Sequence, residues 1–359
     1  YAGDNYSNMD KIGKIGYNGL GLSSSQFSSE YMKVISIRDG YEYTVNFKKG
    51  RPVDKSTGNF ICEDDDSTLS KKDGLLALNI EKSNKPSGTN IKYKPDLEVF
   101  TDIDIPVEWI NNKLKKQAIA NKGLILEFYD EINNVDYTHY YENGIQDYIA
   151  EISKDKNITN IISFHDEGKG KDREDKEEYS VQYEIAFTFN NEVNLLEYYH
   201  NSSELINGGS TANAIESAFT TTIHDFIKNK NLYNKNESKI KFIDIEDSLI
   251  CVISSLSNIT SYANQTKTSI DNKFIKDFIT NSLKDNLTIY FTENTLEADK
   301  IFNQILINKR SREKAESTRK DIKKKLTTNS SKGLSQKIEG LKNCDFRNSK
   351  LEERILLLN

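Results

Sequence analysis

Alternation of apolar and polar residues predicts several strands in this chain. The clearest runs from Tyr179 to Phe189, where every second residue is aromatic or branched aliphatic. Met32 to Ile37 and Tyr41 to Phe47 predict a hairpin, because Asp39-Gly40 between them is a suitable two-residue turn. Leu249 to Leu256 is mainly apolar, which is typical of a buried strand. Shorter strands are expected at Ile91 to Tyr93 and at Leu124 to Tyr129.

Helical spacing and capping residues predict helices between the strands. Ser210-Thr211 can cap a helix from Ala212 to Asn229, and Asn121-Lys122-Gly123 can end one that begins at Trp109. The charged run from Asp166 to Glu178 is expected to be a solvated loop. Further helices are predicted at Leu22 to Ser29, at Ile145 to Ile152, at Lys273 to Leu283 and, as one long helix, at Leu296 to Lys325.

The composition narrows the possible classes of protein. A length of 359 residues suggests two or three domains, and a net charge of −6 gives no general sign of a nucleic-acid partner. Three widely spaced cysteines argue against a disulfide framework and fit a reducing cytoplasm, and the four histidines lack metal-ligand spacing. No apolar run approaches the ~18 residues of a membrane span, so no membrane contact is expected.

The first candidate for chemistry is the polar segment Asn264 to Thr268, which lies between a predicted strand and a predicted helix. Lys267 in this segment is a movable point charge with three donors, which suits a terminal phosphate. A short Gln-Thr-Lys sequence is also common in plain solvated loops. The segment therefore predicts a phosphate contact only if another part of the chain supplies a cradle for the phosphate.

A second candidate is the glycine-rich stretch from Gly16 to Gly21, which precedes a predicted helix. Glycines allow the backbone to approach a phosphate closely, and the N–H groups at a helix N-terminus attract anions. A flexible surface loop would have the same composition, so both interpretations stay open.

The third candidate is a basic stretch within the long predicted helix. Lys309 to Lys325 contains nine basic and three acidic residues, a local charge of +6. Such a stretch can form a face for DNA phosphates, or it can be an exposed helix with ordinary charge pairs. The residues proposed as DNA contacts are Lys309, Arg310, Arg312, Arg319 and Lys320.

The order of these motifs resembles a known family. Gly16 to Gly21 is similar to a glycine-rich phosphate loop, Gly208 to Thr211 to a transducer motif, Gln265 to Lys267 to a phosphate-sensing loop, and Lys309 to Ala315 to the basic helix that follows it. The chain resembles the ATPase subunit of type IIA DNA topoisomerases, which is the B subunit of gyrase and topoisomerase IV. Each motif is loose by itself, and their collinear order is what makes the resemblance specific.

The resemblance implies an α/β (α+β) fold in several parts. The C-terminal part of a GHKL-type ATPase sandwich would be followed by a transducer domain with a left-handed βαβ crossover and a long C-terminal helix. The implied boundaries are 1–105 for the ATPase part, 106–290 for the transducer, 291–326 for the basic helix and 327–359 for a linker toward a Toprim domain.

The resemblance also implies an ATP-dependent type II DNA topoisomerase. Gln265 and Lys267 would be catalytic residues that reach the γ-phosphate. The implied cofactors are ATP and Mg²⁺, and the Mg²⁺ ligands and the general base are expected outside this chain, which alone should not hydrolyse ATP. The implied partners are double-stranded DNA, an A-type cleavage subunit and a second copy of the chain. The implied nucleotide-binding residues are Gly16, Asn18, Gly19, Leu20 and Gly21.

Departures from the family pattern leave other functions open. Asn5 stands where many bacterial members have a lid lysine, Ile15 replaces one of two paired glycines, and Asn264 replaces the glycine before Gln265. One alternative is a GHKL clamp protein, similar to the mismatch-repair type, that closes on DNA without strand passage. Another is a degenerate homologue that only binds DNA or a partner protein.

Overall fold

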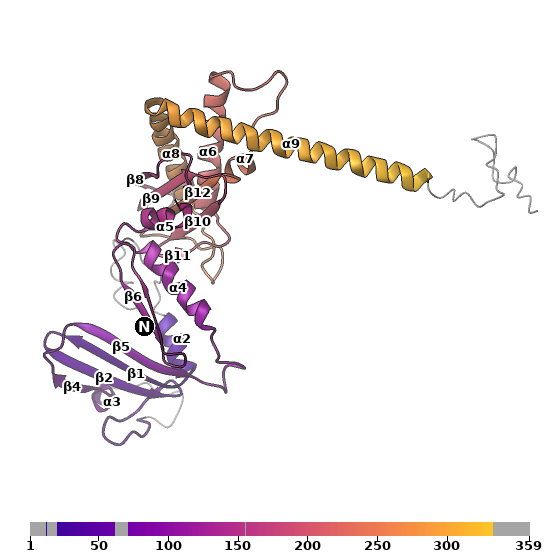
Figure 1. The fold of residues 1–359 in the computed structure, drawn as a ribbon. Helices are drawn as coiled ribbons and strands as arrows, with labels where there is room; N and C mark the ends of the chain where they lie inside the picture. The colour runs from indigo at the N-terminus through magenta and orange to yellow at the C-terminus, as the bar shows by residue number, and fades with distance from the viewer. Residues whose placement is uncertain (1–11, 13–19, 62–70, 155, 333–359) are drawn as a thin grey trace, which may run out of the picture.

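A computed structural model describes residue 12 and residues 20–61, 71–154 and 156–332. Within them the chain forms two separate five-stranded sheets, with a long helix that projects from the second (Figure 1). Residues 333–359, which make up most of the predicted linker, lie outside the described residues. In the described part of the chain, no helix is both long and apolar enough to cross a membrane.

The first sheet is antiparallel and follows the short helix α2, Leu20–Phe27. Its strand order is β3-β2-β1-β5, and β4 pairs with β2. The predicted hairpin is confirmed: Arg38 pairs with Tyr41, and Asp39 and Gly40 adopt positive φ angles of 54° and 79°. The strands are β1 Ser29–Arg38, β2 Tyr41–Lys48, β3 Arg51–Pro52, β4 Asn79–Lys82 and β5 Gly88–Pro95, with helix α3, Lys71–Ala77, before β4.

The second sheet has the strand order β11-β10-β12-β9-β8. β10 and β12 run parallel, and the chain crosses between them through helices α6, Ser210–Asn229, and α7, Phe242–Glu246. This is the predicted βαβ crossover. All other strand pairs in this sheet are antiparallel. The strands are β8 Ile162–Gly170, β9 Tyr179–Phe189, β10 Leu195–His200, β11 Ser203–Glu204 and β12 Leu249–Ser257.

Helices cover the two faces of the second sheet. Helices α6 and α8, Lys273–Glu293, pack on one face, where alternate residues of β9 such as Phe187 are fully buried. Helices α4, Val107–Ala120, and α5, Ile145–Ser153, contribute to a second cluster around Ala186 and Val252 on the other face. The small hairpin of β6, Leu126–Asp130, and β7, Val135–His139, contacts α4.

The charged run from Asp166 to Glu178 is not entirely a loop, which corrects the sequence prediction. Its first five residues extend β8 to Gly170, which pairs with Tyr179. Gly168 and Gly170 leave room for phenylalanine rings of α8: a Cβ atom at these positions would lie 2.5 and 2.3 Å from them. The exposed charges of Glu167 and Lys169 therefore alternate with glycines that face the core. A sequence of alternating charges and glycines is also typical of a loop, which explains the wrong prediction.

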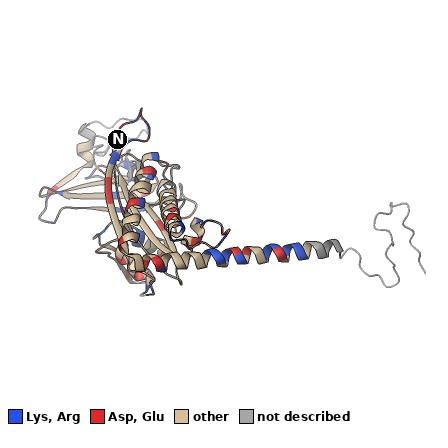
Figure 2. Cartoon of the chain, turned by 90° about the horizontal axis from the view of Figure 1, so that it is seen from above, with Lys and Arg blue, Asp and Glu red and all other residues tan. Residues whose placement is uncertain are grey.

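The long predicted helix is α9, Thr295–Lys332, about 57 Å long at 1.5 Å per residue. Its first turns bury Ile301, Phe302 and Ile305 in the core of the second sheet. Phe291 of α8 packs on Phe302 with a ring-centroid distance of 5.1 Å. Phe291 and the start of α9 therefore belong with the second sheet, although the predicted transducer ended at residue 290. Figure 2 shows the rest of α9 extending away from the sheets with a mostly charged surface.

Candidate functional site

The segment that carries Gln265 and Lys267 is a small hairpin between β12 and α8. Its two arms are held by backbone hydrogen bonds from Asp271 to Ser261 (2.8 Å) and from Ala263 to Ser269 (3.0 Å). The tip spans residues 264–268. Gln265 is exposed and Lys267 is half-buried. The two residues predicted to reach a phosphate therefore share one ordered turn.

Asn264 organises this tip. Its side-chain oxygen accepts hydrogen bonds from the backbone N–H of Thr268 and from the hydroxyl of Thr266, both at 3.1 Å. Its amide nitrogen donates to the hydroxyl of Thr268 at 2.9 Å. Lys267 adopts a left-handed φ of 58°, which costs a non-glycine residue free energy and persists only where neighbours impose it. Asn264 thus stabilises the turn through its side chain.

The base of the hairpin is fixed against the N-terminus of α6. The backbone N–H of Ser210 donates to the carbonyl of Ile270 at 2.9 Å, and Ile270 is nearly fully buried. Gly209 has a φ of 100°, and a Cβ atom there would lie 2.3 Å from the Ile270 oxygen. Gly209 is therefore required because the hairpin and the helix approach so closely at this residue.

Buried polar side chains lie beneath the hairpin. His200, at the end of β10, is fully buried, and its Nδ1 lies 2.8 Å from the Ser255 hydroxyl. Its Nε2 lies 2.9 Å from the Thr260 hydroxyl and 3.1 Å from that of Ser257. Burial lowers the pKa of His200 to about 3, so the imidazole is neutral near pH 7. We call His200, Ser255, Ser257 and Thr260 the histidine cage.

Tyr262 connects the histidine cage to the candidate lysine. Its ring makes an edge contact with the His200 ring at a centroid distance of 6.5 Å. The ammonium of Lys267 lies 5.4 Å from the centre of the same tyrosine ring, within cation–π range. This arrangement was not predicted from the sequence, because His200 and Tyr262 lie far apart along the chain and neither belongs to a recognisable motif.

The predicted glycine-rich cradle falls mostly outside the described residues. Gly16, Asn18 and Gly19 are among the residues that the structure does not describe, while Leu20 and Gly21 form the first turn of α2. The structure therefore supports the predicted position of a helix after the glycines. It does not bring the two predicted halves of a phosphate site together among the described residues.

Three of the five residues predicted to contact DNA are engaged in ion pairs within the chain. Lys309 is fully buried, and its ammonium lies 3.0 Å from Glu237 and 3.2 Å from Glu313. Arg310 makes two hydrogen bonds of 3.0 Å with Glu237. The pKa of Glu237 is lowered to about 2, and the hydrogen bonds from Arg310 are the largest cause. Both cations therefore join α9 to the loop before α7.

Arg312 is bound in the same way. Its guanidinium donates to both carboxylate oxygens of Asp244, at 2.6 and 3.1 Å, and Asp244 is buried. The Asp244 hydrogen bonds raise the pKa of Arg312. This bidentate pair joins α9 to α7. By contrast, Arg319 and Lys320 lie on the exposed distal part of α9, so they remain candidates for DNA contact (Figure 2).

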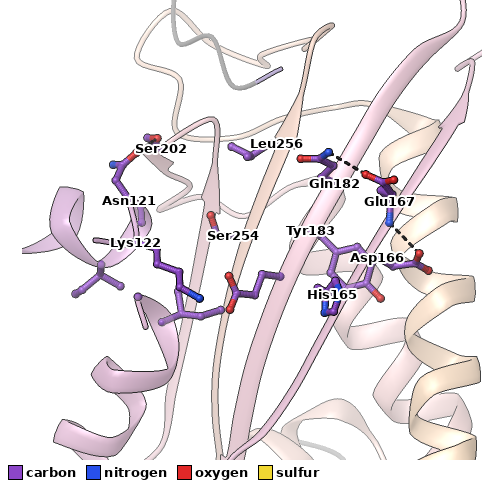
Figure 3. A pocket seen from close by; sticks show the side chains of 15 residues that line it. Asn121, Lys122, His165, Asp166, Glu167, Gln182, Tyr183, Ser202, Ser254 and Leu256 are labelled. Carbon is purple, nitrogen blue, oxygen red and sulfur yellow. Dashed lines mark hydrogen bonds between the residues drawn. The ribbon is translucent and has the colours of Figure 1, made fainter. Parts of the chain in front are cut away.

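A cavity of about 800 Å³ lies on the face of the second sheet beside α4 and α5. Lys122, two residues after the end of α4, lies across it from His165, Asp166 and Glu167 on β8 (Figure 3). Glu167 accepts a hydrogen bond from Gln182 at 3.0 Å. No sequence motif indicated this cavity, because its lining comes from several separate segments. Among the described residues, no group of three or more His, Cys, Asp or Glu side chains could hold a metal ion.

Comparison with known proteins identifies the relatives of this chain. Residues 144–321 match the family model described as DNA gyrase B. The DNA gyrase B protein of Thermotoga maritima is 24% identical over 326 residues, which cover 90% of this chain and 48% of the relative. The DNA gyrase B protein of Mycobacterium tuberculosis is 24% identical over 371 residues, which cover 94% of this chain and 50% of the relative. The chain thus spans about half the length of these relatives.

Solved structures show the same fold. The 43K ATPase domain of Thermus thermophilus gyrase B, in complex with an aminocoumarin, aligns with a TM-score of 0.59 and 18% identity, over 84% of this chain and 74% of that one. The topoisomerase IV ATP-binding domain of Francisella tularensis aligns with a TM-score of 0.57 and 24% identity, over 83% of this chain and 74% of that one. The resemblance noted in the sequence is therefore confirmed: the chain is similar to DNA gyrase B proteins. It shares the fold of the ATPase region of gyrase B and topoisomerase IV.

Proposed function

We propose that this chain is part of the B-type subunit of an ATP-dependent type II DNA topoisomerase. ATP would act with Mg²⁺, whose ligands we expect outside this chain. The partners would be double-stranded DNA, an A-type cleavage subunit and a second copy of the chain. The match of residues 144–321 to the gyrase B family supports this function over a mismatch-repair-like clamp or a degenerate DNA-binding homologue.

The observation that carries the proposal is the ordered hairpin that presents Gln265 and Lys267. An ammonium and an amide on one turn are donors that suit the oxygens of a terminal phosphate. Because both donors need that phosphate as an acceptor, their contacts would exist with ATP and be lost after hydrolysis. A ligand that contacts one state and not the other shifts the population between them.

The structure offers a path from this hairpin to the distal helix. The hairpin leads directly into α8, which begins at Lys273, and α8 packs against the start of α9. Arg310 and Arg312 then fasten α9 to the loop and helix beside it. A shift of the hairpin could therefore move α9 through packed elements rather than through a flexible linker.

The distal part of α9 is the proposed DNA contact. Arg319 and Lys320 are exposed on a helix that projects from the second sheet. Cations in such a position can neutralise phosphates and release counterions, so binding should weaken as the salt concentration rises. The proposal therefore assigns the start of α9 to anchoring and its distal part to DNA.

The proposed function is tested by Lys267→Ala in the full-length protein, assayed with its cleavage partner. We expect DNA-stimulated ATP hydrolysis and supercoil relaxation to fall at least tenfold, because the γ-phosphate loses a charged contact. Lys276→Ala is a matched control, since it removes the same charge from the exposed side of α8. Wild-type rates in the Lys267→Ala protein would rule out the role of the hairpin. ATP-dependent DNA closure without relaxation in the wild-type protein would favour the clamp.

A further inference from the structure

We propose that Tyr262 is a positioning residue for Lys267, and that the histidine cage holds Tyr262 in place. This inference rests on the proposed function of Lys267 and adds the residues that aim it. The lysine would then meet the terminal phosphate from a restrained position rather than as a freely rotating side chain.

The contact between the ammonium and the ring supports the first step. The Lys267 ammonium lies 5.4 Å from the centre of the Tyr262 ring. A lysine side chain has four rotatable bonds and loses much entropy when a ligand fixes it. A ring under the ammonium restrains the ammonium before the ligand arrives. The ring attracts it through the quadrupole of the π system, so the positive charge of the lysine is not neutralised.

The backbone supports the same position. Lys267 has a φ of 58°, and its N–H donates to the carbonyl of Asn264 at 3.2 Å. The side chain of Lys267 reaches from the tip back to Tyr262, which lies on the first arm of the hairpin. The residue therefore combines an uncommon backbone conformation with an aromatic contact, which indicates a restrained side chain.

The histidine cage fixes the ring relative to the second sheet. The Ser255 hydroxyl donates to the Tyr199 carbonyl at 3.1 Å, so it accepts from His200, whose Nδ1 therefore carries the proton. The Ser257 hydroxyl donates to the Ile259 carbonyl at 2.8 Å, so Thr260 is left to donate to Nε2. His200 thus joins the ends of β10 and β12 to the segment that leads to Tyr262.

Asn201 supports the same joint from beside the histidine. Its side-chain amide donates to the Ser257 carbonyl and to the Thr260 hydroxyl, both at 3.1 Å. Its oxygen accepts from the backbone N–H of Ser257 at 2.9 Å. Because Asn201 and His200 are both fully buried, the segment from Ser257 to Thr260 has little freedom to move. Tyr262 is therefore attached to a rigid base two residues away.

The test compares Tyr262→Leu with Tyr262→Phe in the full-length protein. Titration calorimetry would measure the Kd of a non-hydrolysable ATP analogue and the Kd of ADP. We expect Tyr262→Leu to weaken the analogue roughly two- to fivefold and to leave ADP unchanged, because a cation–π contact has about this value. Tyr262→Phe keeps the aromatic face and should retain the wild-type affinity for both nucleotides.

A double-mutant cycle separates this inference from the proposed function. If Tyr262 acts through Lys267, Tyr262→Leu will have no further effect in a Lys267→Ala background. An equal loss of analogue and ADP affinity, or an equal loss in both backgrounds, would overturn the inference and leave a purely structural role for Tyr262. If Lys267→Ala itself leaves the analogue affinity unchanged, the proposed function fails instead.

Discussion

The two sheets of the molecule differ in how fully their apolar residues are covered. Every residue of the two buried clusters lies between Ala118 and Leu306, around the second sheet. In the first sheet, β1 and β2 also direct apolar residues to one face, where Val34 pairs with Val45 and with Ile91. Yet Ile91 and Tyr93 of β5 remain 44% and 49% exposed.

This difference shows which sheet has its apolar residues covered by other described parts of the chain. An antiparallel sheet gains stability when one face packs against another layer. The second sheet has helices on both faces, whereas the apolar face of the first sheet is only partly covered within the part of the chain that the structure describes. The exposed apolar residues of the first sheet fit the half-sandwich that the resemblance implies.

The largest expected effect tests this contrast directly. Phe187→Ala removes a ring that is fully buried and packs on Phe219 at a centroid distance of 5.0 Å. We expect it to lower the free energy of unfolding of the second sheet by about 3–5 kcal/mol. Ile91→Ala in the first sheet should cost no more than about 1 kcal/mol, because the side chain is already part-exposed. Urea denaturation measures both, and equal losses would refute the contrast.

The second prediction compares the two parts of α9. Arg312→Ala leaves the buried carboxylate of Asp244 without its bidentate partner, and we expect it to lower the free energy of unfolding by about 3 kcal/mol. Lys320→Ala lies on the exposed part and should change stability by less than about 0.5 kcal/mol while it weakens DNA binding. Thermal unfolding and a DNA titration at several salt concentrations distinguish the two. A loss of DNA affinity in a fully stable Arg312→Ala protein would support its predicted role as a DNA contact.

Much of the fold could be predicted because its strands and helices carry strong local patterns. The alternation from Tyr179 to Phe189 needs no knowledge of the partner segments. The predicted cap at Ser210 was wrong, because the N-cap residue of α6 is Gly209 and no side-chain cap hydrogen bond forms there. The end of β8 was missed because glycines and charges alternate there. Those glycines are explained only by phenylalanines of α8, about a hundred positions later.

The candidate site was less accessible to prediction, for two physical reasons. A lysine on a helix resembles a solvated charge, so the burial of Lys309 depends on Glu237, which lies 72 positions earlier. The histidine cage combines one histidine with hydroxyls that belong to no motif, and the parallel pairing of β10 and β12 brings His200 beside Ser255. A partial signal was present, since Ser255 and Ser257 occupy alternate positions at the end of a buried strand.

The smallest expected effect is a pH dependence that belongs to the second sheet. The pKa of His200 is lowered by burial to about 3, below its unfolded value of about 6.5. The unfolded chain therefore binds more protons between these values, and stability falls as the pH decreases through this window. From pH 7 to pH 5.5 we expect His200 to cost about 1.3 kcal/mol of the free energy of unfolding. Most carboxylates do not titrate in that interval, so the loss in the free energy of unfolding comes mainly from the histidines.

His200→Gln serves as the matched variant, because its amide can still hydrogen-bond within the cage but carries no titrating group. Its absolute stability can differ from the wild type, so the comparison uses the change between the two pH values. The pKa of His139 and of His224 is also lowered, with burial as the largest cause, and both residues remain in the variant. Subtracting the two pH dependences, measured by urea denaturation, therefore leaves the contribution of His200. An identical pH dependence in both proteins would mean that the cage opens to water before the second sheet unfolds.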